Sequence, residues 1–468
     1  MDTSITNVIQ RDTLLPSKVF RAYDIRGAYP NDLHEAGVYQ LGRSFGTETQ
    51  ERGSKTVVVG RDARLSGPTL KNALVQGLRD SGCDVIDIGA VPTPLLYFAC
   101  AHLKVPAGIM ITGSHNPPQD NGFKMVLNFQ ALDSETILSL QARAQAKRWL
   151  HGQGQYCEQV MDAVYQDILV KDIHLKRPLR VVIDAGNGAA GPLALNTLMA
   201  LGVHTIPLYC EPDGRFPNHH PDPAKPENLK DLIARVHAEQ ADCGLAFDGD
   251  GDRLGVVTPK GEIIWADRLL ILFAESILRQ HAGGTVVFDI KSTRDLVSVI
   301  EAHHGTPVLC RTGHSFIKAK MRECNALLGG EMSGHFFFKD RWYGFDDALY
   351  AGCRLLELLS NVSDVSAYFE ALPKRFSTPE LHIPVADELK FQVVADYIQH
   401  GQFEGAKTIL VDGLRVEYPD AWGLLRASNT VPALVLRFEG NSPEALERIQ
   451  SQMLTQLQRL NVSLANPS

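Results

Sequence analysis

The sequence lacks any long, uninterrupted hydrophobic run. Its most apolar helical stretch, ADRLLILFAESIL at 266–278, is interrupted by charged residues and falls well short of the roughly 20 apolar residues that cross a bilayer. The N-terminus also lacks the basic start and apolar segment of a secretion signal. We therefore expect a cytoplasmic protein with no membrane partner.

The sequence also lacks paired cysteines and an excess of positive charge. The eight cysteines are scattered, without the paired spacing of a zinc site or a disulfide framework, and we interpret them as reduced thiols. The 46 lysines and arginines are outnumbered by 54 acidic residues, which gives a net charge of -8. Such a balance argues against a general affinity for nucleic acid, so no nucleic-acid partner is expected.

The chain of 468 residues is too long for one ordinary core. Three stretches, beginning near 56, 180 and 285, share one pattern: an apolar strand, a polar turn, an amphipathic helix and a second apolar strand. Each helix is followed by a glycine that can adopt the left-handed conformation, namely Gly82, Gly202 and Gly305. Chance similarity is the alternative, but we interpret the pattern as three similar α/β domains with mostly parallel sheets.

The chain from about residue 375 follows a different pattern. AWGLLRASNTVPALVLRFEG predicts two strands around a turn, and SPEALERIQSQMLTQLQRL predicts one long amphipathic helix. The predicted fold class is therefore α/β, with three similar mixed-sheet domains and a smaller C-terminal α+β domain. We place the domains at 1–159, 160–262, 263–374 and 375–468.

Three aspartates alternate with glycines in the segment AFDGDGDRLGVV. Asp248, Asp250 and Asp252 can turn toward one point because glycine lets the backbone curl, and carboxylate oxygens suit Mg²⁺. An EF-hand is excluded because Arg253 and Pro259 stand where it needs Gly and Glu. An acidic surface turn is disfavoured by the apolar segments on both sides, so we predict a metal site.

A serine follows the apolar segment AGIMIT in TGSHNPPQDNGFKM. Gly113 permits a close approach by another group, the two prolines at 117–118 keep the loop extended, and 121–122 (Asn-Gly) is a turn signal. The chain should then double back and bring Lys124 near Ser114. The G-x-S-x-G pattern of a serine hydrolase is absent, so these residues favour phosphate handling over an ordinary Gly-Ser turn.

The charges link these two segments. A phosphorylated serine carries about -2, so together with three aspartates and one Mg²⁺ it needs cations close by. Arg253 and Lys124 would offset part of the negative charge. The phosphorylated serine could also supply a further metal ligand.

The segment DAGNGAAG matches a dinucleotide fingerprint, with G-x-G-x-x-G after a strand and Glu211 about 20 residues later. Taken alone, it would indicate a nicotinamide-dependent dehydrogenase. Asp184, however, would place negative charge where a pyrophosphate lies. We prefer a tight turn in which the glycines let the helix pack closely.

Two more polar segments stand at predicted turns. RASNT offers a guanidinium, hydroxyls and an amide that suit a phosphate, although a random polar turn is equally consistent. GGEMSGHFFF places Glu331, Ser333 and His335 two residues apart, so on an extended segment they would point the same way and could bind sugar hydroxyls. A solvated loop is the alternative there, but three aromatic rings follow at once.

The ordered set TGSHNP, DGDGDR, GEMSGH and RASNT resembles the α-D-phosphohexomutase family, most closely its bacterial phosphomannomutase/phosphoglucomutase members. The resemblance runs along essentially the whole chain. It implies three similar α/β domains and a smaller fourth one around a central cleft. It also implies interconversion of hexose 1-phosphates and hexose 6-phosphates by way of a phosphoserine and a hexose 1,6-bisphosphate.

Carried over residue by residue, the resemblance assigns roles in this chain. The catalytic groups would be Ser114 (the phosphoserine), His115, Lys124 and Arg253, with Lys124 or His115 as acid/base. Mg²⁺ would be held by Ser114, Asp248, Asp250 and Asp252. The substrate-binding groups would be Tyr23, Arg26, Asn116, Lys291, His314, Glu331, Ser333, His335, Arg426, Ser428, Asn429 and Thr430. Among these, the RASNT residues would bind the phosphate that is not transferred, while Glu331 and Ser333 would bind sugar hydroxyls.

The sequence departs from close relatives at one point, since DIKST has a serine where a cysteine is expected. Met332 favours mannose and glucose phosphates, because the amino-sugar mutases usually have Gln there. Phosphoglucosamine mutase and a non-catalytic sugar-phosphate sensor are the alternatives. Small hexose phosphates are the expected partners, and we expect a monomer.

Overall fold

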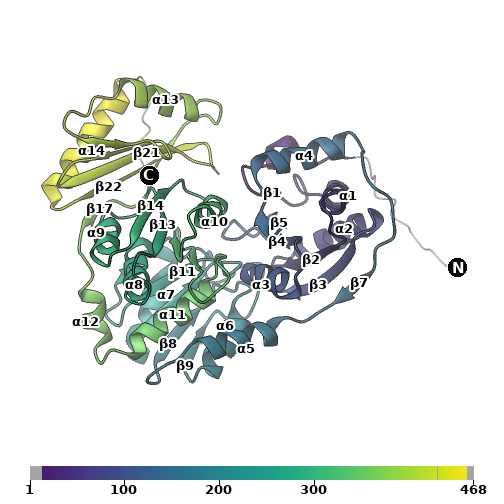
Figure 1. The fold of residues 1–468 in the computed structure, drawn as a ribbon, viewed down its shortest axis with the longest axis horizontal. Helices are drawn as coiled ribbons and strands as arrows, with labels where there is room; N and C mark the ends of the chain where they lie inside the picture. The colour runs from purple at the N-terminus through teal and green to yellow at the C-terminus, as the bar shows by residue number, and fades with distance from the viewer. Residues whose placement is uncertain (1–12, 430, 461–468) are drawn as a thin grey trace. The chain divides into compact units, whose positions relative to one another are not determined.

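The computed structural model describes residues 13–429 and 431–460. These residues form two compact units, one within 1–269 and 333–370 and the other within 270–332 and 371–468 (Figure 1). Among the described residues, four sheets follow one another along the chain. No helix in these ranges combines the length and the apolar character needed to span a membrane.

The first sheet has seven strands in the order β1-β5-β4-β2-β3-β7, with β6 paired to β5. Their bounds are β1 Ile25–Ala28, β2 Thr56–Arg61, β3 Asp84–Ala90, β4 Gly108–Ile111, β5 Asp120–Leu127, β6 Gln130–Ala131 and β7 Tyr156–Glu158. The helices around it are η1 Ser17–Val19, α1 Glu35–Glu51, α2 Gly67–Asp80, α3 Thr93–Leu103 and α4 Ser134–Gln145. In Figure 1 these elements are drawn from purple to blue.

Alternation along β2 explains how the helices cover this sheet. Val57 and Val59 belong to the core that includes residues of α1, α2 and α4, whereas α3 packs against β2 and β4. Because successive side chains of a strand point to opposite faces, α3 covers the face that Val58 lines.

The second sheet also lies in the first unit, with the order β12-β11-β10-β8-β9. Its strands are β8 Arg180–Asp184, β9 His204–Leu208, β10 Cys243–Phe247, β11 Leu254–Val257 and β12 Ile263–Ile264. The other elements of this part are α5 Asp162–Asp172, α6 Gly191–Ala200, η2 Pro226–Leu229, α7 Lys230–Glu239, β16 Phe336–Phe338, α11 Ala348–Ser360 and α12 Val365–Glu370. Helix α11 packs against β10 and β11.

The second unit begins within α8 Ala266–Leu278. Its three parallel strands run β14-β13-β15. They and their helices are β13 Thr285–Asp289, α9 Asp295–Ala302, β14 Thr306–Cys310, α10 His314–Glu323 and β15 Leu328–Gly330.

The last sheet is antiparallel, in the order β17-β22-β21-β20-β19 with β18 paired to β22. The elements are β17 Phe376–Ser377, β18 Leu381–Pro384, α13 Lys390–His400, β19 Lys407–Ile409, β20 Leu414–Glu417, β21 Ala421–Ala427, β22 Ala433–Gly440 and α14 Pro443–Gln458. The two strands and the long helix predicted for this part are confirmed, as is the α/β fold class with a smaller α+β part.

The three predicted strand–helix–strand repeats are confirmed as β2-α2-β3, β8-α6-β9 and β13-α9-β14, each with parallel strands. Gly82 and Gly202 have the predicted left-handed φ, at 99° and 79°. The third prediction is wrong: Gly305 is not left-handed, and His304 before it has a φ of 59°. The helix therefore ends one residue earlier than the glycine pattern indicates.

The glycines of DAGNGAAG serve packing, as preferred from the sequence. A Cβ on Gly188 would lie 2.7 Å from the Gly249 oxygen, and one on Gly191 would lie 1.9 Å from the Cys210 oxygen. The carboxylate of Asp184 accepts a hydrogen bond from the Gly186 amide at 2.9 Å, so negative charge sits in the turn itself. These contacts account for the pattern without a dinucleotide.

Candidate active site

Ser114 lies in the connection between β4 and β5, which form an antiparallel hairpin. The connection contains two tight turns, closed by hydrogen bonds from the Asn116 amide to the Gly113 oxygen at 2.9 Å and from the Asp120 amide to the Pro117 oxygen at 3.0 Å. The extended loop predicted from the prolines is therefore wrong. The predicted turn at 121–122 is wrong too, because these residues belong to β5 and pair with β1.

The side chain of Ser114 is buried, with 1% of its surface exposed. Its Oγ donates to Asp248 Oδ2 at 2.8 Å and lies 3.2 Å from His115 Nδ1. The φ of Ser114 is 50°, in the left-handed region that residues with a side chain rarely adopt. A strained backbone around a buried hydroxyl is a common feature of reactive sites.

The aspartate loop joins the antiparallel strands β10 and β11. Asp248, Asp250 and Asp252 are completely buried, and each offers a carboxylate oxygen within 4.8 Å of the others. A Cβ on Gly249 would lie 2.4 Å from the Ser114 oxygen, so this glycine permits the two loops to approach. The predicted convergence of the three carboxylates is confirmed.

A divalent cation fits this donor set. The Oδ1 atom of Asp250 is buried and has no hydrogen-bond partner among the described residues. Burial, together with the negative charges of Asp250 and Asp252, raises the pKa of Asp248 well above its usual value. A hard cation with a preference for carboxylate oxygens would satisfy the buried oxygen and relieve this repulsion.

Lys124 comes near the aspartates because β5 doubles back along β4. Its ammonium is 2.7 Å from Asp250 Oδ2 and also pairs with Asp252. Burial by itself would lower the pKa of Lys124, but the two carboxylates outweigh it and raise the pKa above its usual value. These contacts place Lys124 at the aspartate loop, and its predicted approach to Ser114 stays a prediction.

Two arginines complete the cationic side of the site. Arg26 donates to Asn116 Oδ1 at 3.1 Å and pairs with Asp24 at 2.6 Å. The Nε atom of Arg253 is buried without a hydrogen-bond partner among the described residues. A guanidinium with an unused donor beside the aspartates is suited to a phosphoryl oxygen.

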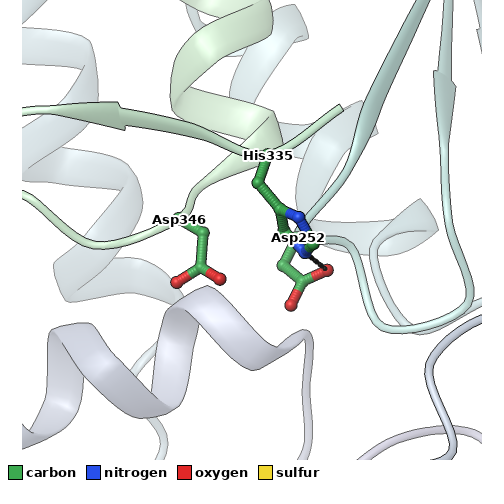
Figure 2. Close-up of side chains that lie close together, drawn as sticks. All are labelled: Asp252, His335 and Asp346. Atoms are coloured by element: carbon green, nitrogen blue, oxygen red, sulfur yellow. Dashed lines mark ion pairs between the residues drawn. The ribbon is translucent and has the colours of Figure 1, made fainter. Parts of the chain in front are cut away.

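His335 also reaches the aspartate loop, and Ser333 contacts His335. The imidazole lies 3.2 Å from Asp252 Oδ1 and 3.0 Å from Ser333 Oγ, and Figure 2 shows it directed at Asp252 with Asp346 beside them. Asp252, His335 and Asp346 form a second group whose ligand atoms lie within 4.8 Å of one another. This group shares Asp252 with the first one, so it belongs to the same site.

The extended segment predicted for Glu331, Ser333 and His335 is wrong. β15 ends at Gly330, residues 332–333 form a turn, and Gly334 has a φ of 102°. Ser333 and His335 belong to the first unit, whereas Glu331 belongs to the second. In the second unit, Glu331 Oε1 accepts a hydrogen bond from the Gly313 amide at 2.6 Å.

The other predicted residues of the second unit are Lys291, His314, Arg426, Ser428 and Asn429. Lys291 is buried and pairs with Glu380 at 2.5 Å. Arg426 Nε donates to Asp412 at 2.8 Å, and its Nη2 has no hydrogen-bond partner among the described residues. Thr430 lies outside the described residues. Tyr23, in the first unit, precedes β1.

Several residues at these sites escaped the sequence reasoning. Thr93 Oγ1 donates to Asp250 Oδ2 at 2.5 Å, and Asp62 and Arg64 support the serine loop. The available signal was GRDAR, where charged side chains follow directly after a buried parallel strand. Carboxyl ends of such strands carry many functional groups.

Four family models match consecutive stretches of the chain. They describe phosphoglucomutase/phosphomannomutase α/β/α domains I, II and III and the C-terminal domain, and they match 17–149, 156–261, 265–376 and 380–456. The chain belongs to this family. The resemblance carried by the four sequence motifs is confirmed, and so is the enzyme class, a phosphohexomutase.

Individual relatives are similar over nearly the whole length. A phosphomannomutase/phosphoglucomutase of Pseudomonas aeruginosa is 50% identical over 97% of this chain and 98% of its own. A phosphoglucomutase of Neisseria gonorrhoeae is 49% identical over 93% of this chain and 95% of its own. The crystal structure of a family protein from Burkholderia thailandensis is 48% identical, with a TM-score of 0.93 over 97% of this chain and 100% of that one.

Proposed function

We propose that this protein interconverts hexose 1-phosphates and hexose 6-phosphates, with Ser114 as the carrier of the phosphoryl group. The observation behind the proposal is the buried hydrogen bond of 2.8 Å from Ser114 Oγ to Asp248, within a cluster of three aspartates. The hydrogen bond to Asp248 alone satisfies the serine hydroxyl as a donor, so hydrogen bonding to Ser114 does not explain the other two carboxylates. The hydroxyl is well placed for phosphoryl transfer.

In the first step, the phosphoryl group moves from Ser114 Oγ to the free hydroxyl of a hexose monophosphate. The bond from phosphorus to Ser114 Oγ breaks, a bond to the sugar oxygen forms, and the proton of the sugar hydroxyl is passed to Ser114 Oγ through His115 or Lys124. A neutral His115 would accept the proton first and then donate it, whereas the Lys124 ammonium, paired with Asp250 and Asp252, would donate to Ser114 Oγ first and then accept. The product is a hexose 1,6-bisphosphate. In the second step, the other phosphoryl group of this intermediate returns to Ser114, and the isomeric monophosphate leaves.

The charges of the site support such a transfer. The three carboxylates with Lys124 and Arg253 leave a formal charge of about -1, and a phosphorylated Ser114 adds about -2. We infer that Mg²⁺ is held by Asp248, Asp250, Asp252 and the phosphorylated Ser114, where it would neutralise charge on the transferred group. Arg253 would stabilise the same charge through its unused donor.

The phosphate that is not transferred needs its own binding groups. We assign this role to Arg426, Ser428, Asn429 and Thr430, with Lys291 and His314 as further contacts. The Nη2 atom of Arg426, which has no hydrogen-bond partner within 13–429 and 431–460, supports the assignment, since a buried guanidinium donor gains most from an anion. Tyr23, Arg26, Asn116, Glu331, Ser333 and His335 are proposed to contact the sugar or its phosphates.

We propose mannose and glucose phosphates as the substrates. The similar proteins are named phosphomannomutase/phosphoglucomutase and phosphoglucomutase, and Met332 stands where the amino-sugar mutases usually have Gln. We further propose that hexose 1,6-bisphosphate activates the enzyme by phosphorylating Ser114. A monomer in the cytoplasm, acting on free sugar phosphates, completes the proposal.

A coupled assay tests this function. Glucose 1-phosphate is converted in the presence of Mg²⁺ and a trace of glucose 1,6-bisphosphate, and the parent protein is compared with Ser114→Ala. Ser44→Ala is the control, since Ser44 is also completely buried and its hydroxyl accepts a hydrogen bond from the Trp149 side chain. We expect turnover in the parent and in Ser44→Ala and none in Ser114→Ala. Turnover that survives the loss of Ser114 would refute the assignment of the nucleophile.

A further inference from the structure

The loop that carries Ser114 rests on two charged side chains without a part in the proposed chemistry. Asp62 follows β2 directly, and Arg64 lies two residues later. Both are completely buried, and they form an ion pair at 3.1 Å between Arg64 Nε and Asp62 Oδ2. Burying an ion pair is unfavourable unless further hydrogen bonds satisfy both groups, so the other contacts of this pair indicate what it serves.

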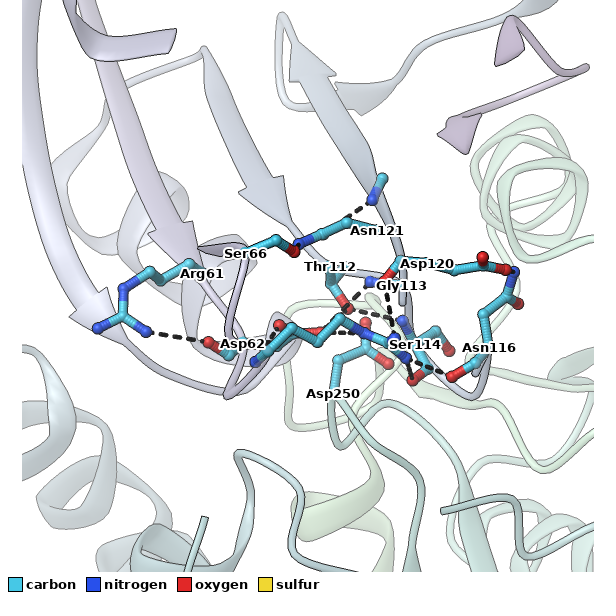
Figure 3. Close-up of polar contacts among 12 residues, drawn as sticks. Arg61, Asp62, Ser66, Thr112, Gly113, Ser114, Asn116, Asp120, Asn121 and Asp250 are labelled. Atoms are coloured by element: carbon cyan, nitrogen blue, oxygen red, sulfur yellow. Dashed lines mark hydrogen bonds and ion pairs between the residues drawn. The ribbon is translucent and has the colours of Figure 1, made fainter. Parts of the chain in front are cut away.

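The carboxylate of Asp62 holds the start of the loop. Its Oδ2 accepts hydrogen bonds from Thr112 Oγ1 at 2.7 Å and from the Gly113 amide at 3.3 Å. Thr112 Oγ1 in turn accepts a hydrogen bond from the Ser114 amide at 2.8 Å. These contacts, which Figure 3 shows, connect Asp62 to the backbone of Ser114 through one hydroxyl.

The guanidinium of Arg64 holds the rest of the loop. Besides Nε, which donates to Asp62, it has four N–H groups. They donate to four backbone oxygens, those of Ser114 at 2.7 Å, Asn116 at 2.6 Å, Pro117 at 2.5 Å and Asp120 at 2.8 Å. All five donors of the side chain are thus used on Asp62 and the serine loop. A lysine, with three donors on a single nitrogen, cannot make this set of contacts.

The surroundings of Arg64 are shaped to admit it. A Cβ on Gly113 would lie 2.6 Å from Arg64 Cζ, so the guanidinium fits under the loop only because residue 113 is glycine. The ring of Phe216 covers the guanidinium at 5.2 Å from its centroid. A Cβ on Gly214 would lie 2.6 Å from Arg64 Cα. The close approach predicted at Gly113 is therefore the approach of Arg64.

Ser114 needs such support because of its backbone conformation. A left-handed φ of 50° is sterically unfavourable for serine, so the surrounding contacts must fix it. Its amide donates to Thr112 Oγ1, which itself donates to Asp62, and its carbonyl accepts directly from Arg64, so both contacts lead to the same buried pair.

We propose that the buried Asp62–Arg64 pair is a positioning device, which holds the Ser114 loop so that Ser114 Oγ stays beside Asp248 during both phosphoryl transfers. The inference rests on the proposed function of Ser114. Neither Asp62 nor Arg64 takes a proton or touches the transferred group in this account. Their effect on the reaction passes through the position of Ser114.

The variant Arg64→Lys tests the proposal, because it keeps the charge and loses the planar set of donors. Arg354→Lys is a matched control. Arg354 is also buried, forms hydrogen bonds of 2.9 and 2.8 Å to the Asp340 carboxylate and lies 4.6 Å from the Phe338 ring centroid. Both variants replace a buried guanidinium that is paired with an aspartate, but of the two arginines only Arg64 contacts the serine loop.

Two readouts separate positioning from general destabilisation. We expect kcat of Arg64→Lys to fall about 100-fold, with KM within a factor of about three, while kcat of Arg354→Lys matches the parent. In hydrogen exchange, the amides of 113–122 should lose protection in Arg64→Lys alone. Equal effects of the two variants, or an unchanged kcat in Arg64→Lys, would overturn the proposal.

The exchange measurement also distinguishes this proposal from the proposed function. If the parent converts no hexose phosphate while Arg64→Lys still loosens 113–122, the proposed function fails and the support of the loop by Arg64 stands. If the parent is active and 113–122 keep their protection in Arg64→Lys, the positioning role fails and the function stands.

Discussion

Replacing Gly249 by alanine should disrupt the contact between the serine loop and the aspartate loop. The added Cβ would lie 2.4 Å from the Ser114 carbonyl oxygen, whereas ordinary contact begins at 3.4 Å. One of the two loops must therefore retreat by about 1 Å. The Ser114 oxygen is held by Arg64 at 2.7 Å, and the hydrogen bond from Ser114 Oγ to Asp248 is 2.8 Å long. A shift of 1 Å takes that hydrogen bond beyond its normal range.

A misplacement of this size near reacting atoms lowers turnover by about 100-fold. The assay is kcat at saturating glucose 1-phosphate, Mg²⁺ and glucose 1,6-bisphosphate. Gly42→Ala is the matched control, because a Cβ on Gly42 would lie 2.4 Å from the Leu74 oxygen, where α1 packs on α2. Gly42→Ala should lower thermal stability and leave kcat unchanged. A Gly249→Ala variant with the kcat of the parent would refute the argument that the closeness of the two loops sets the position of Ser114.

Two further predictions concern the metal and the second unit. Chelation of divalent cations should abolish turnover, and Mg²⁺ should restore it. Asp250→Asn should raise the Mg²⁺ concentration needed for half-maximal turnover by about 100-fold. Turnover that persists in excess chelator would contradict the prediction of a metal site. Burial by itself would raise the pKa of Glu380, but the charge of Lys291 outweighs burial and lowers the pKa from 4.5 to about 2. The ionised carboxylate therefore stabilises the folded state fully above pH 4.5, and this stabilisation is lost as the pH falls toward 2. Glu380→Gln should lower the free energy of unfolding at pH 7 by about 3 kcal/mol. In urea unfolding this difference should shrink below pH 4.5, and a difference that does not change with pH would contradict the prediction.

Local sequence patterns were sufficient to predict the three strand–helix–strand repeats and the carboxylate cluster of the candidate active site. Three aspartates alternating with glycines between apolar strands predicted a carboxylate cluster, because a short loop between two buried strands leaves them few directions. The doubling back of the chain toward Lys124 was predicted as well, although from a turn signal at 121–122 that lies within β5. Both predictions depend on segments that are close in sequence.

The missed contacts depend on the order of strands. Asp62 meets Thr112 because β2 lies next to β4 in the sheet, and a single sequence does not reveal that order. The Asn-Gly pair at 121–122 looked like a turn, but Gly122 faces β1, where a Cβ would lie 2.4 Å from the Ile25 oxygen. This glycine serves a close approach between strands. The turn lies earlier in the loop.

The wrong prediction for residues 331–335 has a local cause. Glu331 and Ser333 are two residues apart and were expected to point the same way, but a turn follows β15 and they belong to different compact units. An extended segment and a turn have similar polar composition here, so the sequence pattern did not distinguish them. Gly334, with its φ of 102°, was the local signal for the turn.

The most direct test of the central claim is a single turnover of labelled phosphoenzyme. The protein is phosphorylated with radiolabelled hexose 1,6-bisphosphate, freed of excess reagent, and mixed with unlabelled glucose 1-phosphate and Mg²⁺. We predict that the label maps to Ser114 before mixing and appears in glucose 1,6-bisphosphate and glucose 6-phosphate afterwards. Label that maps to another residue, stays on the protein, or leaves only as inorganic phosphate would contradict the phosphoserine mutase account.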